Sequence, residues 1–261
     1  MRPRNLGDEA MSVDVMKASD LKIMITGGAR GIGGAAAELF AKKGARVLIC
    51  DVLEEEGEAL AGRLGGNVRF ADLDVTSEQD WKDAVSQAET EFGGVNALFN
   101  NAGIVSFGNV ETCSPDEFRR VIDINLHGVF LGLHVCAPAI RKAGGGVIVN
   151  TSSTAGLQGY GGLAAYVASK WGVRGLTKAA ALDLADANIR VVSLHPGPIH
   201  TPMTAGFGQD TVAAQPIARF GEAEEVARMV EFIITSATFS TGSEFVIDGG
   251  AVAGAVLRFP D

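Results

Sequence analysis

Leu21-Lys-Ile-Met-Ile-Thr26 runs directly into Gly27-Gly-Ala-Arg-Gly-Ile-Gly33, and this stretch decides the fold. Its first half is mostly apolar and predicts a buried strand, and a helix is predicted to follow over residues 31–43. Glycines between a strand and a helix let the backbone turn tightly and approach a pyrophosphate, which would lie on the N-terminus of the helix. A glycine-rich turn alone has little specificity, but its place between the first strand and the first helix predicts a dinucleotide site.

The remainder of the chain repeats this alternation of short apolar runs and amphipathic stretches. Further strands are predicted at 46–50, 68–73, 95–99, 146–151, 190–194 and 244–247, and further helices at 54–64, 77–92, 163–187 and 222–235 and within 114–143. Strands that alternate with helices form a parallel sheet that is covered on both faces. We therefore predict an α/β fold of the Rossmann type, in which a doubly wound parallel sheet of seven strands has helices on both faces.

We expect a single domain. The length of 261 residues, 47% of them apolar, suits one globular domain with a large core. Residues 1–20 mix charged and apolar side chains and are expected to form a flexible extension, so that the folded domain covers residues 21–261. Residues 201–216 are the longest irregular stretch, and loops of this kind often cover a substrate.

Charge and composition argue against several classes of partner. A net charge of −9 and a pI near 5.0 offer no basic surface for nucleic acid. Three cysteines without a Cys-x-x-Cys pair and four histidines without metal-ligand spacing predict neither a disulfide framework nor a metal site. The N-terminus lacks the apolar core of a secretory signal, and glycines interrupt the uncharged stretch 143–169. We therefore expect a cytoplasmic protein without a membrane span.

Tyr166 and Lys170 stand four residues apart in Tyr-Val-Ala-Ser-Lys, and Ser153 lies thirteen residues before the tyrosine. Residues i and i+4 share one face of a helix, so both side chains can point into one pocket. A free phenol has a pKa of about 10, and a positive charge at about 4 Å lowers the free energy of the phenolate by about 4 kcal/mol. The pattern therefore predicts a phenol that exchanges a proton near neutral pH, with Ser153 available to hold a carbonyl oxygen.

Asp51 ends the second predicted strand and indicates the preferred nucleotide. A carboxylate at this position can accept hydrogen bonds from both ribose hydroxyls of NAD and would repel the 2′-phosphate of NADP. Arg30 in the glycine turn could pair with that phosphate, but Val52 after Asp51 supplies no second cation. The sequence therefore favours NAD over NADP.

Polar and small residues follow two further strands. Asp74-Val75 comes after the third predicted strand and would lie beside the adenine. Asn101-Ala102-Gly103 comes after the fourth and would line the cofactor cleft. Ligands bind at the carboxyl ends of the strands in open α/β sheets, so both groups fall where a nucleotide is expected.

Taken together, these residues resemble the short-chain dehydrogenase/reductase family over roughly residues 21–250. The resemblance rests on Thr26–Gly33, Asn100–Gly103, Asn125 in Ile-Asn-Leu-His-Gly, Ser153, Tyr166–Lys170 and Pro196-Gly197. It implies an enzyme with a catalytic tetrad of Asn125, Ser153, Tyr166 and Lys170. Tyr166 would be the general acid and base, Lys170 would lower its pKa and bind the nicotinamide ribose, and Asn125 would help to place a water for a proton relay. Ser152 competes with Ser153, and the family spacing of thirteen to the tyrosine selects Ser153.

The same resemblance implies a full set of cofactor-binding residues. They are Gly27, Arg30, Gly31, Ile32, Gly33, Asp51, Val52, Asp74, Val75, Asn101, Ala102, Gly103, Tyr166, Lys170, Pro196, Gly197, Ile199 and Thr201. Within this set, the run from Pro196 through Ile199 to Thr201 would meet the nicotinamide end.

The substrate is less sharply indicated. Trp171-Gly-Val-Arg-Gly-Leu-Thr-Lys, the Thr201-Pro-Met203 run and the glycine-rich strings near the C-terminus look like those of bacterial NAD-dependent 3α,20β-hydroxysteroid dehydrogenases. We therefore expect an oxidoreductase that interconverts a secondary alcohol and a ketone, on a steroid or another alicyclic ring. Similar strings occur in 3-oxoacyl-thioester reductases and dihydrodiol dehydrogenases, which remain alternatives. A non-catalytic nucleotide-binding sensor would be marked by a missing tetrad residue, and none is missing.

Self-association is also expected. The predicted helices near 116–140 and 163–187 carry apolar and small residues on more than one face. Packing against one face of a sheet requires only one apolar face per helix, so the others are available for a second copy. The run 251–259 is apolar as well and would be costly to expose. The resemblance implies a homotetramer, and a dimer fits the same features.

Overall fold

The computed structural model describes residues 16–254, and a sheet of seven parallel strands lies at its centre. In chain order the strands are β1 (Lys22–Thr26), β2 (Arg46–Asp51), β3 (Val68–Asp72), β4 (Ala97–Asn100), β5 (Gly146–Thr151), β6 (Ile189–Pro196) and β9 (Glu244–Ile247). Across the sheet they follow the order β3-β2-β1-β4-β5-β6-β9, and every neighbouring pair is parallel. The chain builds outward from β1 in one direction and from β4 in the other, so the predicted doubly wound sheet is confirmed.

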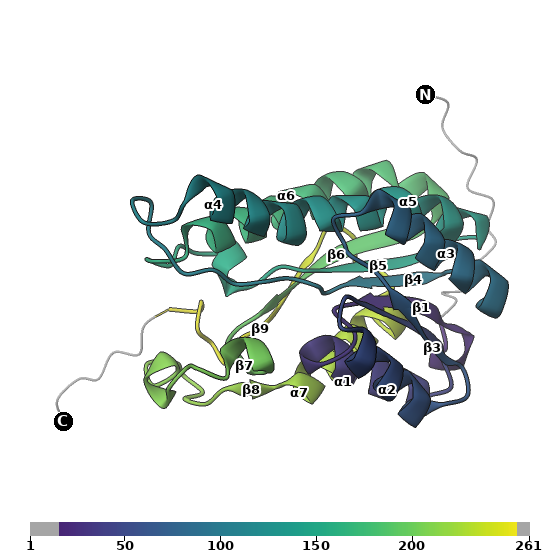
Figure 1. Cartoon of the computed structure of the whole chain (residues 1–261), viewed down its shortest axis with the longest axis horizontal. Coiled ribbons are helices and arrows are strands. Elements are labelled where there is room, and N and C mark those ends of the chain that lie inside the picture. The colour runs from purple at the N-terminus through teal and green to yellow at the C-terminus, as the bar shows by residue number, and fades with distance from the viewer. Residues whose placement is uncertain (1–15, 255–261) are drawn as a thin grey trace.

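Helices cover both faces of the sheet (Figure 1). One face carries α1 (Gly31–Lys42), α2 (Glu54–Leu64) and α7 (Ala223–Thr235), and the other carries α3 (Glu78–Phe92), α4 (Pro115–Ile122), α5 (Gly128–Lys142) and α6 (Ala164–Asp183). Each of these helices falls within a stretch whose amphipathic pattern predicted a helix.

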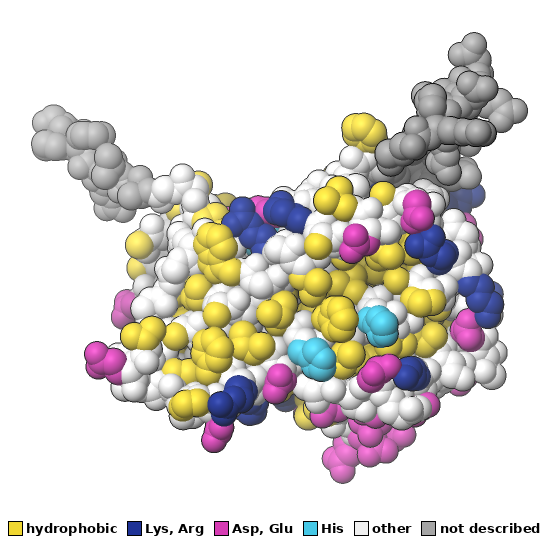
Figure 2. Space-filling model, turned by 90° about the horizontal axis from the view of Figure 1, so that it is seen from above, with side chains coloured by type: hydrophobic (Ala, Val, Ile, Leu, Met, Phe, Trp, Pro, Cys, Tyr) yellow, Lys and Arg dark blue, Asp and Glu magenta, His cyan; other side chains and the backbone are white. Residues whose placement is uncertain are grey.

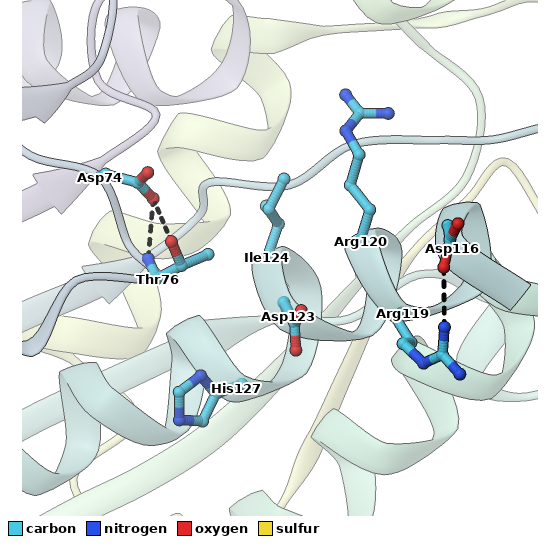
Figure 3. Close-up of a pocket in the computed structure, with 8 residues that line it drawn as sticks. All are labelled: Asp74, Thr76, Asp116, Arg119, Arg120, Asp123, Ile124 and His127. Atoms are coloured by element: carbon cyan, nitrogen blue, oxygen red, sulfur yellow. Dashed lines mark hydrogen bonds and ion pairs between the residues drawn. The ribbon is translucent and has the colours of Figure 1, made fainter.

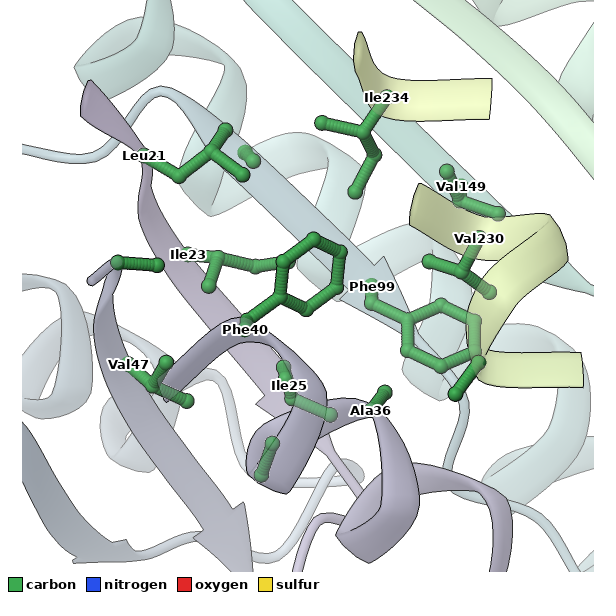
Figure 4. Close-up of a cluster of buried hydrophobic side chains, with 14 of the residues drawn as sticks. Leu21, Ile23, Ile25, Ala36, Phe40, Val47, Phe99, Val149, Val230 and Ile234 are labelled. Carbon is green, nitrogen blue, oxygen red and sulfur yellow. The ribbon is translucent and has the colours of Figure 1, made fainter. Parts of the chain in front are cut away.

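The sheet separates two apolar cores because successive side chains of a strand point to opposite faces. In β1, Ile23 and Ile25 join the core that contains Phe40 of α1 (Figure 4). Met24 between them joins the other core, together with Trp81 of α3. Both faces of the central strands are therefore buried, which explains why their sequences read as continuous apolar runs instead of alternating ones.

Two features went unpredicted. The short strands β7 (Ile199–His200) and β8 (Gly221–Glu222) pair in parallel and close the base of the segment 201–220. Two-residue strands carry too few side chains to show a periodicity, so the pattern missed them. In addition, a π-helical turn at Asp123–His127 joins α4 to α5, and π turns of this kind occur often at functional sites.

Some predictions concern residues at the edge of what the structure describes. Most of the expected extension over residues 1–20 lies outside the described residues, and its last part holds one 3₁₀ turn at Ala18–Asp20. The end of the apolar run 251–259 likewise lies beyond the described residues. Within residues 16–254, no group of three or more His, Cys, Asp or Glu side chains could hold a metal ion.

One helical stretch has the length and hydropathy of a membrane span. Within residues 16–254 this stretch is Pro115–Lys142, which runs through α4, the π turn and α5, and 50% of its most apolar window is buried in the fold. Some of its apolar side chains, such as Leu131 and Ile140, face the sheet and belong to the core. A core helix of this kind passes the same length and hydropathy test, so the stretch is weak support for a membrane span.

Candidate active site

A cavity of about 1420 Å³ opens at the carboxyl ends of the parallel strands. Its walls come from the glycine turn after β1, from the ends of β2, β4, β5 and β6, and from the segment 201–216. The predicted site residues that line it are Gly27, Arg30, Gly31, Ile32, Asp51, Val52, Asp74, Val75, Asn101, Ala102, Gly103, Ser153, Tyr166, Lys170, Pro196, Gly197, Ile199 and Thr201. The fold therefore gathers them in one place, and two predicted residues, Gly33 and Asn125, lie behind the wall.

The glycine turn has the shape that a pyrophosphate needs. Gly27 and Gly31 adopt the left-handed region, with φ of 60° and 57°, which side chains rarely enter. Gly33 packs against the turn, since a Cβ there would lie 2.1 Å from the carbonyl oxygen of Gly27. Arg30 caps α1 without a side-chain hydrogen bond, so the first amide groups of the helix have no side-chain acceptor. An anion at this turn would meet backbone N–H groups and the positive end of the helix dipole.

Asp51 is fixed at the edge of the same turn. It is 8% exposed, and its carboxylate accepts hydrogen bonds from the backbone N–H of Ala29 at 3.0 Å and of Leu53 at 3.2 Å. A carboxylate has further lone pairs, which remain for the hydroxyls of a ribose. Arg30, the cation that could attract a 2′-phosphate, forms an ion pair with Glu56 at 3.6 Å.

Asp74 lies where the cavity adjoins a second hollow of about 580 Å³ (Figure 3). Its carboxylate accepts hydrogen bonds from the backbone N–H and the hydroxyl of Thr76, which fix its orientation. Arg120 and Ile124 line both spaces and project from the same side of the helix (Figure 3). These two residues were not predicted, because the cofactor site was predicted from residues that follow the carboxyl ends of strands. Arg120 and Ile124 instead come from the helical stretch that begins at Pro115.

Tyr166 and Ser153 meet at the centre of the cavity. Burial raises the pKa of Tyr166 because it disfavours the phenolate, a hydrogen bond with Ser153 acts in the opposite direction, and the nearby Tyr160 adds to the rise. The Ser153 hydroxyl oxygen accepts a hydrogen bond from the backbone N–H of Ala155 at 3.1 Å. Ser152, the competitor, instead donates to the carbonyl oxygen of Lys170 at 2.9 Å. Of the two serines, Ser153 is therefore the one that influences the phenol, and both Ser153 and Tyr166 line the cavity.

Lys170 lies beside Tyr166, with its Nζ atom 5.6 Å from the centroid of the phenol ring. The ammonium donates a hydrogen bond to the carbonyl oxygen of Thr151 at 2.9 Å, and burial lowers its pKa to about 8. The sequence argument expected the ammonium to lower the pKa of Tyr166. In the structure burial exceeds the other influences on the phenol and raises its pKa, and the effect of Lys170 on the phenol stays a prediction.

Asn125 lies in the π turn behind Lys170 and is fully buried. Its side-chain oxygen accepts from the backbone N–H of Ile104 at 2.8 Å, and its amide donates to the Ile104 carbonyl at 2.9 Å and to the Ser169 hydroxyl at 3.1 Å. These bonds occupy the amide group, so Asn125 connects the loop after β4 to α6. Its predicted part in a proton relay stays a prediction.

His195 is a residue to which the sequence pattern assigned no part in the site. It is fully buried in β6, and its Nδ1 atom lies 3.0 Å from the carbonyl oxygen of Ser153. A carbonyl oxygen only accepts, so Nδ1 carries the proton and Nε2 accepts from the Ser193 hydroxyl at 2.8 Å. Burial lowers the pKa of His195, which agrees with this neutral form. The ring therefore positions the backbone of Ser153, and only the spatial neighbourhood of β5 and β6 reveals it.

Comparison with known proteins agrees with this architecture. The family model described as "short chain dehydrogenase" matches residues 22–211. The chain therefore belongs to the short-chain dehydrogenase family, and the resemblance noted from its motifs is confirmed.

Several curated relatives share nearly the whole chain. A trans-4-hydroxycyclohexanecarboxylate dehydrogenase of Sinomonas cyclohexanicum is 45% identical and covers 90% of this chain and 94% of its own length. A 3-alpha-(or 20-beta)-hydroxysteroid dehydrogenase of Mycobacterium bovis is 43% identical, covering 88% of this chain and 89% of its own. A cyclohexanol dehydrogenase of an Acinetobacter species is 45% identical, covering 87% of this chain and 92% of its own.

Proposed function

We propose that the protein is an NAD-dependent oxidoreductase that interconverts a secondary alcohol and a ketone on an alicyclic or steroid ring. The observation that carries this proposal is the meeting of Tyr166, Ser153 and Lys170 in one cavity with the glycine turn after β1. The relatives support the substrate class, because their names specify cyclohexanol, trans-4-hydroxycyclohexanecarboxylate and hydroxysteroids.

Each reacting group has a defined task in the proposed reaction. In oxidation, the Tyr166 phenolate takes the proton of the alcohol, and in reduction the same hydroxyl returns it to the ketone oxygen. Ser153 holds the substrate oxygen, since its own oxygen accepts from Ala155 and its proton is available to donate. Lys170 supplies a positive charge beside the phenol. When bound, the nicotinamide accepts or delivers the hydride, and its positive oxidised ring further favours the phenolate.

The preference for NAD follows from charges around the ribose site. Asp51 is buried and held by two backbone amides, so a 2′-phosphate would face a fixed negative charge. Arg30 is the nearest cation of the glycine turn, and its ion pair with Glu56 reduces its attraction for a phosphate. Asp51 also disfavours the alternative of an acyl-thioester reductase. The net charge of −9 argues in the same direction, because it offers no basic surface for an acidic carrier protein.

A direct test measures absorbance at 340 nm with cyclohexanol, a 3α-hydroxysteroid and their ketones, each with NAD and NADP in parallel. We expect turnover of at least one alicyclic pair and a kcat/KM with NAD at least about tenfold above that with NADP, which corresponds to about 1.4 kcal/mol. No absorbance change with any pair would contradict the enzyme and would favour a nucleotide-binding sensor. An equal or higher value with NADP would contradict the cofactor preference alone.

We also propose that the protein is cytoplasmic and forms a homo-oligomer through the outer face of α4, α5 and α6. Figure 2 shows apolar side chains gathered across this face with two histidines among them. Phe118, Phe130, Trp171 and Leu182 are its large exposed apolar residues, with exposed fractions from 39% to 80%. On a monomer such a surface would be in contact with water, so burial against a second copy would be favourable.

Replacement of Phe130 by glutamate tests this face. The side chain is 46% exposed and stacks between His127 and His134, so it lies on the outer face near the start of α5. We expect the wild type to have the mass of a tetramer or dimer by light scattering, and the variant to shift toward a smaller species. Val110→Glu serves as the control, because Val110 is exposed but lies on the loop before α4. A monomeric wild type would refute the proposal.

A further inference from the structure

Three polar side chains form a connected group in the wall of the cavity, and the mechanism above does not use them. Tyr160 accepts a hydrogen bond from the Gln158 amide at 2.8 Å and donates one to the Thr154 hydroxyl at 3.1 Å. All three residues line the cavity. We call Thr154, Gln158 and Tyr160 the polar anchor.

The anchor lies beside the reacting groups. It belongs to the segment that begins directly after Ser153, and its Tyr160 phenol is close enough to Tyr166 to influence that residue electrostatically. Its backbone is held by the bridge between Gly108 and Leu163, in which the Gly108 N–H donates to the Gly162 carbonyl at 2.8 Å. The loop that carries the anchor is therefore tied at its end to the segment after β4, and the anchor faces the same cavity as Tyr166.

The anchor has hydrogen-bonding capacity left over. Thr154 is 5% exposed, and its hydroxyl accepts from Tyr160, so its own proton remains available. Among the bonds of the described residues, the Gln158 side chain uses only one N–H, which leaves its carbonyl oxygen and its second N–H. An apolar wall would suffice for a plain cycloalkanol. The polar anchor is uncharged and offers both donors and acceptors, so it matches a hydroxyl or carbonyl oxygen on the substrate.

The remaining walls of the substrate side carry no positive charge. The segments 103–109, 154–163 and 201–216 contain neither lysine nor arginine, and their only charged residue is Asp210. The cations that line the cavity within residues 16–254 are Arg30 of the glycine turn, Arg120, which also lines the second hollow, and Lys170, which bonds to Thr151. A carboxylate on the substrate would lose its hydration without gaining an ion pair, which is costly.

From this arrangement we propose that the polar anchor binds a second, uncharged oxygen of the substrate, a hydroxyl or a carbonyl on the ring system away from the reacting carbon. The preferred substrates are thus alicyclic diols, hydroxyketones or oxygenated steroids, and not the anion of a hydroxycycloalkane carboxylic acid. This inference rests on the proposed function and specifies the substrate class of the same site.

The test compares four substrates that share one reacting group: cyclohexanol, 1,3-cyclohexanediol, 1,4-cyclohexanediol and trans-4-hydroxycyclohexanecarboxylate. For the wild type we expect kcat/KM to be highest with a diol and lowest with the carboxylate. In Tyr160→Phe we expect the ratio of kcat/KM between the best diol and cyclohexanol to fall about tenfold, the loss that follows from removing a hydrogen bond and leaving its partner unpaired. Gln158→Met, which keeps the side-chain length, should lower the same ratio.

Met203→Leu is the matched control, since Met203 lines the same cavity without a hydrogen-bonding group and should leave the ratio unchanged. Thermal unfolding of each variant shows whether the fold is kept, and Gln158→Met carries the test if Tyr160→Phe does not fold. Equal losses on cyclohexanol and the diols would mean that the anchor only supports its own loop, and would overturn the proposal. So would a wild type that prefers the carboxylate. If no cyclic alcohol is turned over at all, the proposed function itself fails.

Discussion

Replacement of Tyr166 by phenylalanine is expected to lower kcat for cyclohexanol oxidation by about a thousandfold, because general acid–base catalysis contributes about 10²- to 10⁴-fold. The variant loses only the hydroxyl that exchanges the proton. Burial raises the pKa of this phenol, and a hydrogen bond with Ser153 lowers it in part. The remaining stabilisation of the phenolate must come from Lys170 and from the bound oxidised nicotinamide, so the reaction depends on one hydroxyl in one position.

Two measurements separate this role from a structural one. Fluorescence titration with NADH should give nearly the wild-type Kd, since the glycine turn and Asp51 are unchanged in Tyr166→Phe. The thermal unfolding midpoint should also stay within a few degrees, because only the hydroxyl is removed and the ring keeps its place in the cavity wall. Activity near that of the wild type would refute the assignment of Tyr166 as the acid and base.

Lys170→Met is expected to abolish most activity and, at the same time, to make the protein more stable at pH 7. Burial lowers the pKa of Lys170 from 10.5 to about 8, so the folded state holds a charge that it disfavours. A change of this size corresponds to about 3 kcal/mol. The loss of the hydrogen bond to Thr151 removes about 1 kcal/mol of this gain. We expect a net gain of about 2 kcal/mol, or about 5 °C in the unfolding midpoint.

The stability gain of Lys170→Met is expected to depend on pH. The folded pKa of Lys170 lies below the unfolded value, so the folded state binds fewer protons between about pH 8 and 10.5. The penalty for the buried charge is fully present below about pH 8 and fades as the pH rises toward 10.5. The stability gain of Lys170→Met should therefore shrink between pH 8 and pH 10.

Lys178→Met, two turns further along the same helix, is the matched control. Its ammonium is half-exposed and pairs with Glu244, so its removal should bring no gain at any pH. If Lys170→Met were less stable than the wild type at pH 7, the buried charge of Lys170 would not be its main contribution to the stability of the fold.

Much of the fold could be predicted because both faces of the sheet are buried. The run 146–151 was predicted as a strand from apolar and β-branched residues alone, and it is β5 with the same bounds. The pair β7 and β8 was missed because its four residues follow no period, and it is held by pairing between residues that lie 22 positions apart in the sequence. The hydrophobic pattern of a segment predicts a strand whose side chains are buried. It does not predict a strand that exists only because two distant segments pair.

The candidate site shows the same division. The spacing of Tyr166 and Lys170 placed both side chains on one helix face, and both line the cavity. The amide of Asn125, in contrast, is held by Ile104 and Ser169, and no spacing in the sequence predicts that it lies behind the wall. His195 was assigned no part in the site, because its contact with Ser153 joins two neighbouring strands 42 residues apart.

By itself the sequence determined the class of fold, the glycine turn and the identity of the groups that can exchange a proton, since these depend on residue type and short spacing. The tertiary structure alone decided the protonation tendencies of Tyr166 and Lys170 and the grouping of Thr154, Gln158 and Tyr160 beside them. The physical reason is that pKa values and hydrogen-bond partners depend on burial and on distances across the fold, and neither is contained in the order of residues along a strand or a helix.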